Sequence, residues 1–129
     1  MSPLSHLDIG QIGENATLQH YQKLGYKLVV KNYWKPFGEI DVIVRNDQEL
    51  IFIEVKSVSC NSFAVTSPDT ANPAENIHHK KRARLRKAIG AFFVEYPRFA
   101  PKWRVDVALV RVNTKAKLAR IEILPDVIL

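Results

Sequence analysis

The feature that most constrains the fold of this chain is a pair of short apolar segments joined by a polar turn. The segments are residues 38–44 and 50–56, with residues 46–49 between them. Both segments are rich in β-branched residues, and the polar stretch is of the hairpin type. Because side chains alternate faces along a strand, Glu54 and Lys56 share one face, opposite Ile51, Ile53 and Val55. The sequence therefore predicts two adjacent strands that carry charged side chains at one end.

Length and charge restrict the class of protein. The 129 residues fit one domain spanning residues 1–129, and the net charge of +6 makes a polyanion such as nucleic acid the first candidate partner. The single cysteine, Cys60, cannot form an intramolecular disulfide. Neither a signal peptide nor an apolar run of about 18 residues is visible, so we expect a cytoplasmic protein without a membrane span.

Periodicity and turn residues predict the order helix, three strands, helix, two strands. The segments are residues 9–24, 26–34, 38–44, 50–56, 72–95, 103–112 and 118–124. Gly25 is placed to cap the first helix, and residues 72–75 form a capping box for the second. Residues 57–71 read as a long loop. Helices interleaved with strands predict an α/β fold, in which a three-strand antiparallel meander belongs to a central mixed sheet flanked by helices.

Asp41 and Glu54 are candidate metal ligands. Mg²⁺ prefers hard oxygen ligands and is usually held by one or two carboxylates, and the carbonyl of Val55 is a candidate third ligand. A metal there would polarise a phosphate and acidify a bound water, with Lys56 orienting that water or stabilising negative charge. The alternative is purely structural: a Glu54–Lys56 ion pair at a sheet edge, with Asp41 solvated.

Asp41, followed after twelve residues by Glu54-Val55-Lys56, is similar to the PD-(D/E)XK nuclease motif. The chain as a whole resembles the bacterial YraN family at residues 13–14, 24–26, 38–41, 52–56, 81–85 and 104–107. The resemblance implies a restriction-endonuclease-like fold and a Mg²⁺- or Mn²⁺-dependent DNA endonuclease. It assigns metal binding to Asp41 and Glu54 and assistance of the nucleophile to Lys56.

Two further carboxylates extend the predicted site. The resemblance to archaeal Holliday junction resolvases implies that Glu14 on the first helix joins it, with a solvated helix carboxylate as the alternative. Glu39 shares a strand face with Asp41 and is a candidate extra ligand or partner of Lys56. The resemblance also implies branched or damaged DNA as substrate, and a homodimer as a candidate assembly because junction cleavage needs two sites.

The chain departs from the nuclease pattern at two positions. Ile40 stands where the nominal motif has proline, and Val58 stands where an arginine is expected. Neither change removes a predicted metal ligand. The arginine would have supplied a phosphate contact, so its absence concerns substrate binding and cleavage efficiency.

The second predicted helix carries the densest basic run, residues 78–87. Lys80, Arg84 and Lys87 lie along one helix face and are candidates for phosphate contacts, with a merely solvated basic face as the alternative. Lys81 falls nearer the buried stripe and is the one placed to reach the catalytic pocket. His78 and His79 diverge by about 100°, which argues against joint metal ligation.

We expect most aromatic residues to have packing roles. Phe92, Phe93 and Tyr96 are assigned to helix packing, and Tyr33, Trp34 and Phe37 to the core, with base stacking by these last three as the alternative. Asp106, inside an apolar strand, is assigned a structural ion pair. Two rivals to the nuclease remain: a non-catalytic nucleic-acid-binding protein of the same fold, and a protein-interaction module whose basic helix meets an acidic partner.

Overall fold

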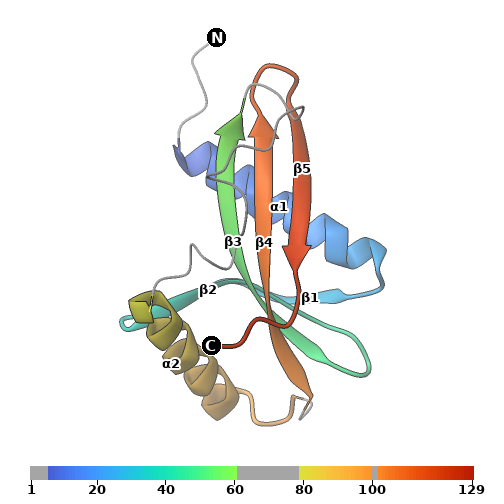
Figure 1. Ribbon diagram of the computed structural model, residues 1–129. Coiled ribbons are helices and arrows are strands. Elements are labelled where there is room, and N and C mark those ends of the chain that lie inside the picture. The colour runs from blue at the N-terminus through green and yellow to red at the C-terminus, as the bar shows by residue number, and fades with distance from the viewer. Residues whose placement is uncertain (1–5, 61–78, 100–101) are drawn as a thin grey trace.

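The computed structural model describes residues 6–60, 79–99 and 102–129. Within these ranges the chain forms α1 (His6–Lys23), β1 (Lys27–Lys35), β2 (Gly38–Arg45), β3 (Leu50–Cys60), α2 (His79–Glu95), β4 (Trp103–Asn113) and β5 (Leu118–Leu124). The strands form one sheet in the order β1-β2-β3-β4-β5 (Figure 1). β1, β2 and β3 are antiparallel neighbours, β3 and β4 are parallel, and β5 is antiparallel to β4. The predicted α/β order, meander and mixed sheet are confirmed.

The two helices pack on opposite faces of the sheet. Phe52 of β3 belongs to the core cluster that contains Phe92 of α2, whereas its neighbours Ile51 and Ile53 pack with Tyr21 of α1. This arrangement explains why consecutive residues of β2 and β3 are buried, since a strand covered on both faces has no solvent side. In Figure 1, α1 crosses the face behind β3, β4 and β5, and α2 lies near β2. Neither described helix is long and apolar enough to cross a bilayer.

Two glycines let the helices approach the sheet closely. A Cβ on Gly13 of α1 would lie 1.7 Å from Ser57 Oγ on β3, and a Cβ on Gly38 would lie 2.4 Å from the carbonyl oxygen of Arg84 on α2. Side chains at these positions would collide with the opposite element. The glycines therefore determine how near Glu14 and the basic residues of α2 come to the strands.

Some local predictions are confirmed and others are wrong. Gly25 has a φ of 95° and donates to the Gln22 carbonyl, as the predicted helix cap requires. β3 continues to Cys60 instead of giving way to a loop at residue 57, because it pairs with β4 along its whole length. Tyr96, assigned to helix packing, is exposed, although its ring lies against that of Phe92. The predicted helix start at residues 72–75 lies outside the described residues.

Candidate functional site

The predicted metal ligands lie where β2 and β3 separate. The ladder between these strands ends at the pair Val42–Ile53, one step before Asp41 would oppose Glu54. The Val55 N–H donates to Asp41 Oδ2 at 2.8 Å, so a carboxylate takes the place of the strand carbonyl. The splayed strands bring both carboxylates to one end of the ladder, on the sheet face that α2 covers.

Asn32 of β1 joins two more of the predicted carboxylates. It has a φ of 53°, a left-handed conformation that asparagine adopts more readily than most residues. With its amide oriented as the hydrogen-bond network requires, its nitrogen donates to Glu14 Oε1 at 2.9 Å and to Glu39 Oε1 at 3.3 Å. Sequence reasoning missed Asn32, although an asparagine inside a run of strand-forming residues is a recognisable signal.

The carboxylates crowd one another electrostatically. Burial raises the pKa of Asp41 to about 8, and the neighbouring charge of Glu54 contributes to the rise. Burial also raises the pKa of Glu14, to which the charges of Glu39 and Glu54 add. The hydrogen bond from Val55 and the amide of Asn32 lower these pKa values but do not outweigh burial and repulsion. Burial and mutual repulsion therefore favour the protonated forms of Asp41 and Glu14 more than in a free side chain.

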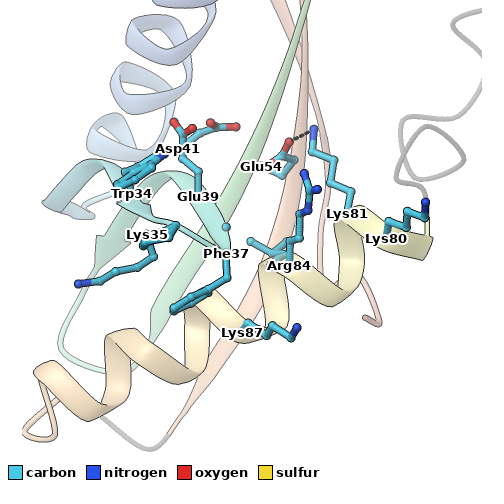
Figure 2. A pocket seen from close by; sticks show the side chains of 13 residues that line it. Trp34, Lys35, Phe37, Glu39, Asp41, Glu54, Lys80, Lys81, Arg84 and Lys87 are labelled. Carbon is cyan, nitrogen blue, oxygen red and sulfur yellow. Dashed lines mark ion pairs between the residues drawn. The ribbon is translucent and has the colours of Figure 1, made fainter.

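Lys81 of α2 supplies a cation to this cluster. Its Nζ forms an ion pair with Glu54 Oε1, drawn as a dashed line in Figure 2, and the Glu54 side chain is only 7% exposed. Burial lowers the pKa of Lys81, but the carboxylates of Glu54, Asp41 and Glu39 together raise it above its ordinary value. Lys81 thus lies at the pocket, where its helical position predicted it.

Lys56 occupies a different place. By strand alternation it shares the face of Glu54, two residues further along β3, and it is half-buried. Among the described residues it forms no ion pair and does not line the cleft beside Asp41. The structural alternative predicted a Glu54–Lys56 ion pair at a sheet edge, but Glu54 pairs with Lys81 and β3 is the central strand. It also predicted a solvated Asp41, whereas this side chain accepts a hydrogen bond from the Val55 N–H.

These groups lie along a cleft of about 1050 Å³ between the β1–β2 turn and α2. Its lining combines three carboxylates, four basic side chains of α2 and two aromatic rings: Glu39, Asp41, Glu54, Lys80, Lys81, Arg84, Lys87, Trp34 and Phe37 (Figure 2). Glu14 and Lys56 are not part of the lining. The cleft therefore brings together the predicted metal ligands Asp41 and Glu54 with the predicted phosphate-binding face.

The geometry suits a cation that uses few protein ligands. Within the part of the chain that the structure describes, no three acidic, histidine or cysteine side chains converge closely enough to enclose a metal ion. Asp41 and Glu54 offer two carboxylates. In an extended strand the N–H and C=O of a residue point to the same side, so the Val55 carbonyl also faces the Asp41 side. Two carboxylates and a carbonyl match the partial protein shell of Mg²⁺.

Comparison with known proteins identifies the family. The model of the uncharacterised protein family UPF0102 matches residues 13–110. The chain belongs to this family. The resemblance to YraN proteins is thereby confirmed, and the matched span of UPF0102 runs from the Gly13–Ser57 helix contact through the whole cleft to β4.

Relatives of similar length support the UPF0102 assignment. A UPF0102 protein of Moorella thermoacetica is 30% identical over 115 residues, which is 89% of this chain and 90% of the relative. The one from Beutenbergia cavernae is 33% identical over 88% of this chain and 90% of its own length. That of Carboxydothermus hydrogenoformans is 34% identical over 80% and 81%. These names state a family and no activity.

A second buried carboxylate in this UPF0102 protein lies on the other face of the sheet. Asp106 of β4 accepts the Tyr21 hydroxyl at 2.6 Å, Arg104 Nε at 3.0 Å and the Asp126 N–H at 3.0 Å. Arg104 Nη1 also donates to Glu49 Oε1 at 2.9 Å. The predicted structural ion pair of Asp106 is confirmed, and its partner is Arg104.

Proposed function

We propose that this protein is a Mg²⁺- or Mn²⁺-dependent DNA endonuclease with a restriction-endonuclease-like fold. The observation that carries the proposal is the meeting of the Asp41 and Glu54 carboxylates in an open cleft whose opposite wall is basic. Carboxylates suit a divalent metal, and a row of Lys and Arg suits a phosphodiester backbone. The element order and the splayed β2–β3 pair support the fold.

The donor set fits a hard divalent cation. One carboxylate oxygen of Asp41 accepts the Val55 N–H, and the other oxygen and the neighbouring carboxylate of Glu54 would be the ligands of the metal. Burial and the neighbouring charge of Glu54 raise the pKa of Asp41, and a divalent ion bound there would displace the proton. Glu14 and Glu39, held by Asn32, are adjacent carboxylates for additional water-mediated contacts.

Each residue of the site has a distinct task in this proposal. A bound Mg²⁺ would polarise the scissile phosphate and acidify a water molecule. Asp41, Glu54 and the Val55 carbonyl would hold the cation. Lys81, beside Glu54, neutralises charge on the phosphate, and Lys56 orients the attacking water as the family resemblance implies.

The substrate preference in this proposal is branched or damaged DNA. It follows first from the resemblance to junction resolvases. In addition, the two helices of the described residues are far apart in sequence and do not form a helix-turn-helix motif, which would read a base sequence. Lys80, Arg84 and Lys87 provide contacts to phosphates that do not depend on sequence. A homodimer would present two clefts to a four-way junction.

The test is metal-dependent cleavage of linear, flapped and four-way DNA by the whole protein. Asp41→Asn is the preferred variant because an amide oxygen still accepts the Val55 N–H, so the strand contact survives. We expect cleavage with Mg²⁺ or Mn²⁺, none with EDTA, and none with Asp41→Asn. Lys115→Ala, in the β4–β5 turn away from the cleft, is the matched control. Cleavage that survives Asp41→Asn would overturn the proposal.

One observation favours the non-catalytic alternative, a DNA-binding protein of the same fold. Glu54 is already paired with Lys81, and Lys56 lies outside the cleft lining. In that case DNA binding would weaken with salt, no substrate would be cut, and Mg²⁺ would not raise the melting temperature. If Mg²⁺ raises the melting temperature and Asp41→Asn abolishes that rise, the result favours the nuclease.

A further inference from the structure

The cleft carries an exposed aromatic rim. Trp34 at the end of β1 is 65% exposed and Phe37 in the following turn is 41% exposed, whereas the adjacent Tyr33 is buried in the α2-side core. The predicted core role is therefore right for Tyr33 and wrong for Trp34 and Phe37. Both exposed rings line the same cleft as Asp41 and Glu54, as Figure 2 shows.

The turn that bears these rings is fixed against α2. Tyr33 Oη donates to Glu95 Oε1 at 2.7 Å, and Lys35 forms an ion pair with the same carboxylate. Gly38 packs directly on the Arg84 carbonyl. These contacts on both sides of the turn hold it against α2, so that Trp34 and Phe37 line the same cleft as the basic side chains.

The basic wall defines the path of that ligand. Lys80, Arg84 and Lys87 recur at helical spacing and are exposed on the cleft side of α2. Lys80 and Lys87 are seven residues apart, about 10 Å along the helix axis. A phosphodiester backbone following these three cations would direct its bases toward the aromatic turn. In a paired duplex the base faces are covered by their neighbours, and aromatic side chains stack on them only when the strand is single.

We propose that the cleft binds unpaired nucleotides, with Trp34 and Phe37 stacking on bases while Lys80, Arg84 and Lys87 hold the phosphates. The inference deepens the proposed nuclease function, on which it rests, by naming single-stranded segments such as flaps and overhangs as the part of the substrate at the site. An acidic peptide would satisfy the basic wall but would leave the two rings without a planar partner, so nucleic acid is the favoured occupant.

The chain offers a direct optical test, because its only tryptophans are Trp34 and Trp103. Trp103 packs against Phe52 and Phe93 with ring centroids 5.7 and 5.8 Å away, so Trp103→Phe is a mild change. In that variant Trp34 is the single indole. Titration with oligo(dT) in EDTA should quench its fluorescence, and a blunt DNA duplex at the same salt should quench it far less.

Substitutions in the aromatic rim distinguish base stacking from nonspecific electrostatic binding of DNA. Trp34→Ala should weaken oligo(dT) binding about 10-fold and leave duplex binding within about twofold, and Trp34→Phe should restore most of the loss. Tyr96→Ala is the matched control, since Tyr96 is an exposed aromatic of the same region that does not line the cleft. Far-ultraviolet circular dichroism of each variant establishes that it is folded.

Salt dependence tests the basic wall. Three cations on a single strand should give a slope of log Kd against log salt of magnitude about 2, which Lys87→Ala should reduce by about 0.7 and Lys115→Ala should leave unchanged. Equal quenching by duplex and single strand, no effect of Trp34→Ala, or binding of polyglutamate as tight as that of oligo(dT) would each overturn the inference. Because binding is measured in EDTA, its failure is distinct from a failure to detect cleavage.

Discussion

Two carboxylates on opposite faces of one sheet, Asp106 and Asp41, have opposite surroundings. Asp106 receives hydrogen bonds from Tyr21, Arg104 and the Asp126 backbone, so three donors from three segments neutralise it. Asp41 receives one backbone N–H, and its burial together with the neighbouring charge of Glu54 raises its pKa. A carboxylate with a structural role, such as Asp106, is surrounded by hydrogen-bond donors of the protein itself. A carboxylate with few such donors, such as Asp41, is stabilised when it binds a cation from solution.

The two clusters also differ in access. Asp106 is fully buried, whereas Asp41 and Glu54 line an open cleft. The only cation paired with the Asp41–Glu54 cluster within the described residues is Lys81, whose side chain is 54% exposed. A partly exposed ammonium is easily displaced, while Arg104 is tied to both Asp106 and Glu49. The following predictions separate the two kinds of site.

The largest effect is expected on catalysis. Asp41→Asn should lower metal-dependent DNA cleavage about 1000-fold or more, because a lost ligand removes several kcal/mol of charge stabilisation. The same substitution should leave the free energy of unfolding unchanged or raise it, since an amide needs no proton to remain neutral in the folded state, whereas Asp41 has to keep one. Cleavage rates and urea unfolding of the same preparation measure both. A clearly destabilised Asp41→Asn protein would mean that Asp41, like Asp106, serves the fold.

Asp106→Asn should do the reverse. Breaking the buried Arg104–Asp106 pair should cost about 3 kcal/mol of unfolding free energy. Any remaining folded protein should bind Mg²⁺ as tightly as the unmodified chain, because Asp106 is on the α1 face, away from the cleft. Thermal unfolding with and without Mg²⁺ tests this expectation. An effect of Asp106→Asn on metal affinity would show that the two clusters are coupled through the sheet.

The pH dependence of stability should report Asp41. Its pKa is about 8 in the folded protein and about 4 in an unfolded chain, so the folded state keeps a proton that the unfolded state has released. The resulting stabilisation is complete below about pH 4 and is lost as the pH rises through about 8, a change on the order of 5 kcal/mol. Urea unfolding between pH 5 and 8 should show a steeper decline for the unmodified chain than for Asp41→Asn.

An exposed carboxylate provides the comparison for that experiment. Asp47→Asn, in the β2–β3 turn, changes the net charge by the same amount at a solvent-exposed position. Its pH profile should run parallel to that of the unmodified chain. If Asp47→Asn and Asp41→Asn flatten the profile equally, the slope comes from overall charge and not from the crowded carboxylates.

The smallest effect concerns Lys81. Lys81→Met removes the ammonium that competes for Glu54 and should raise Mg²⁺ affinity about fivefold, or about 1 kcal/mol. Isothermal titration calorimetry measures the change, with Lys80→Met, one residue away and exposed, as the control. Cleavage should fall in the same variant, because Lys81 also neutralises the phosphate. Weaker metal binding would assign Lys81 to holding the carboxylates in place.

Local patterns predicted much of this molecule. Strand alternation predicted Glu54 on the face opposite Ile51 and Ile53, which pack against α1, and helical periodicity predicted Lys80, Arg84 and Lys87 on one helix face. The spacing of Asp41 and Glu54 corresponds to a hairpin that brings them together, which β2 and β3 form. Such features depend on residues near one another in the chain, so the sequence is sufficient to predict them.

Long-range contacts account for what was missed. The extension of β3 to Cys60 depends on β4, about fifty residues later, which supplies hydrogen bonds to a polar segment that reads as a loop. Tyr21 and Asp106 are 85 positions apart, and their pairing follows from the packing of α1 on the sheet. The Lys81–Glu54 pair likewise depends on the Gly38–Arg84 contact, which has no local signature.

The hydrogen bond from Val55 to Asp41 makes one backbone amide a natural spectroscopic probe. Its proton is shared with the carboxylate that carries the raised pKa, so its NMR chemical shift follows the ionisation of that group. Its exchange with solvent deuterium depends on the end of the β2–β3 ladder staying closed. The Val55 amide resonance therefore reports the ionisation of Asp41, the binding of a ligand beside it and the local opening of the strands, without a label in the cleft.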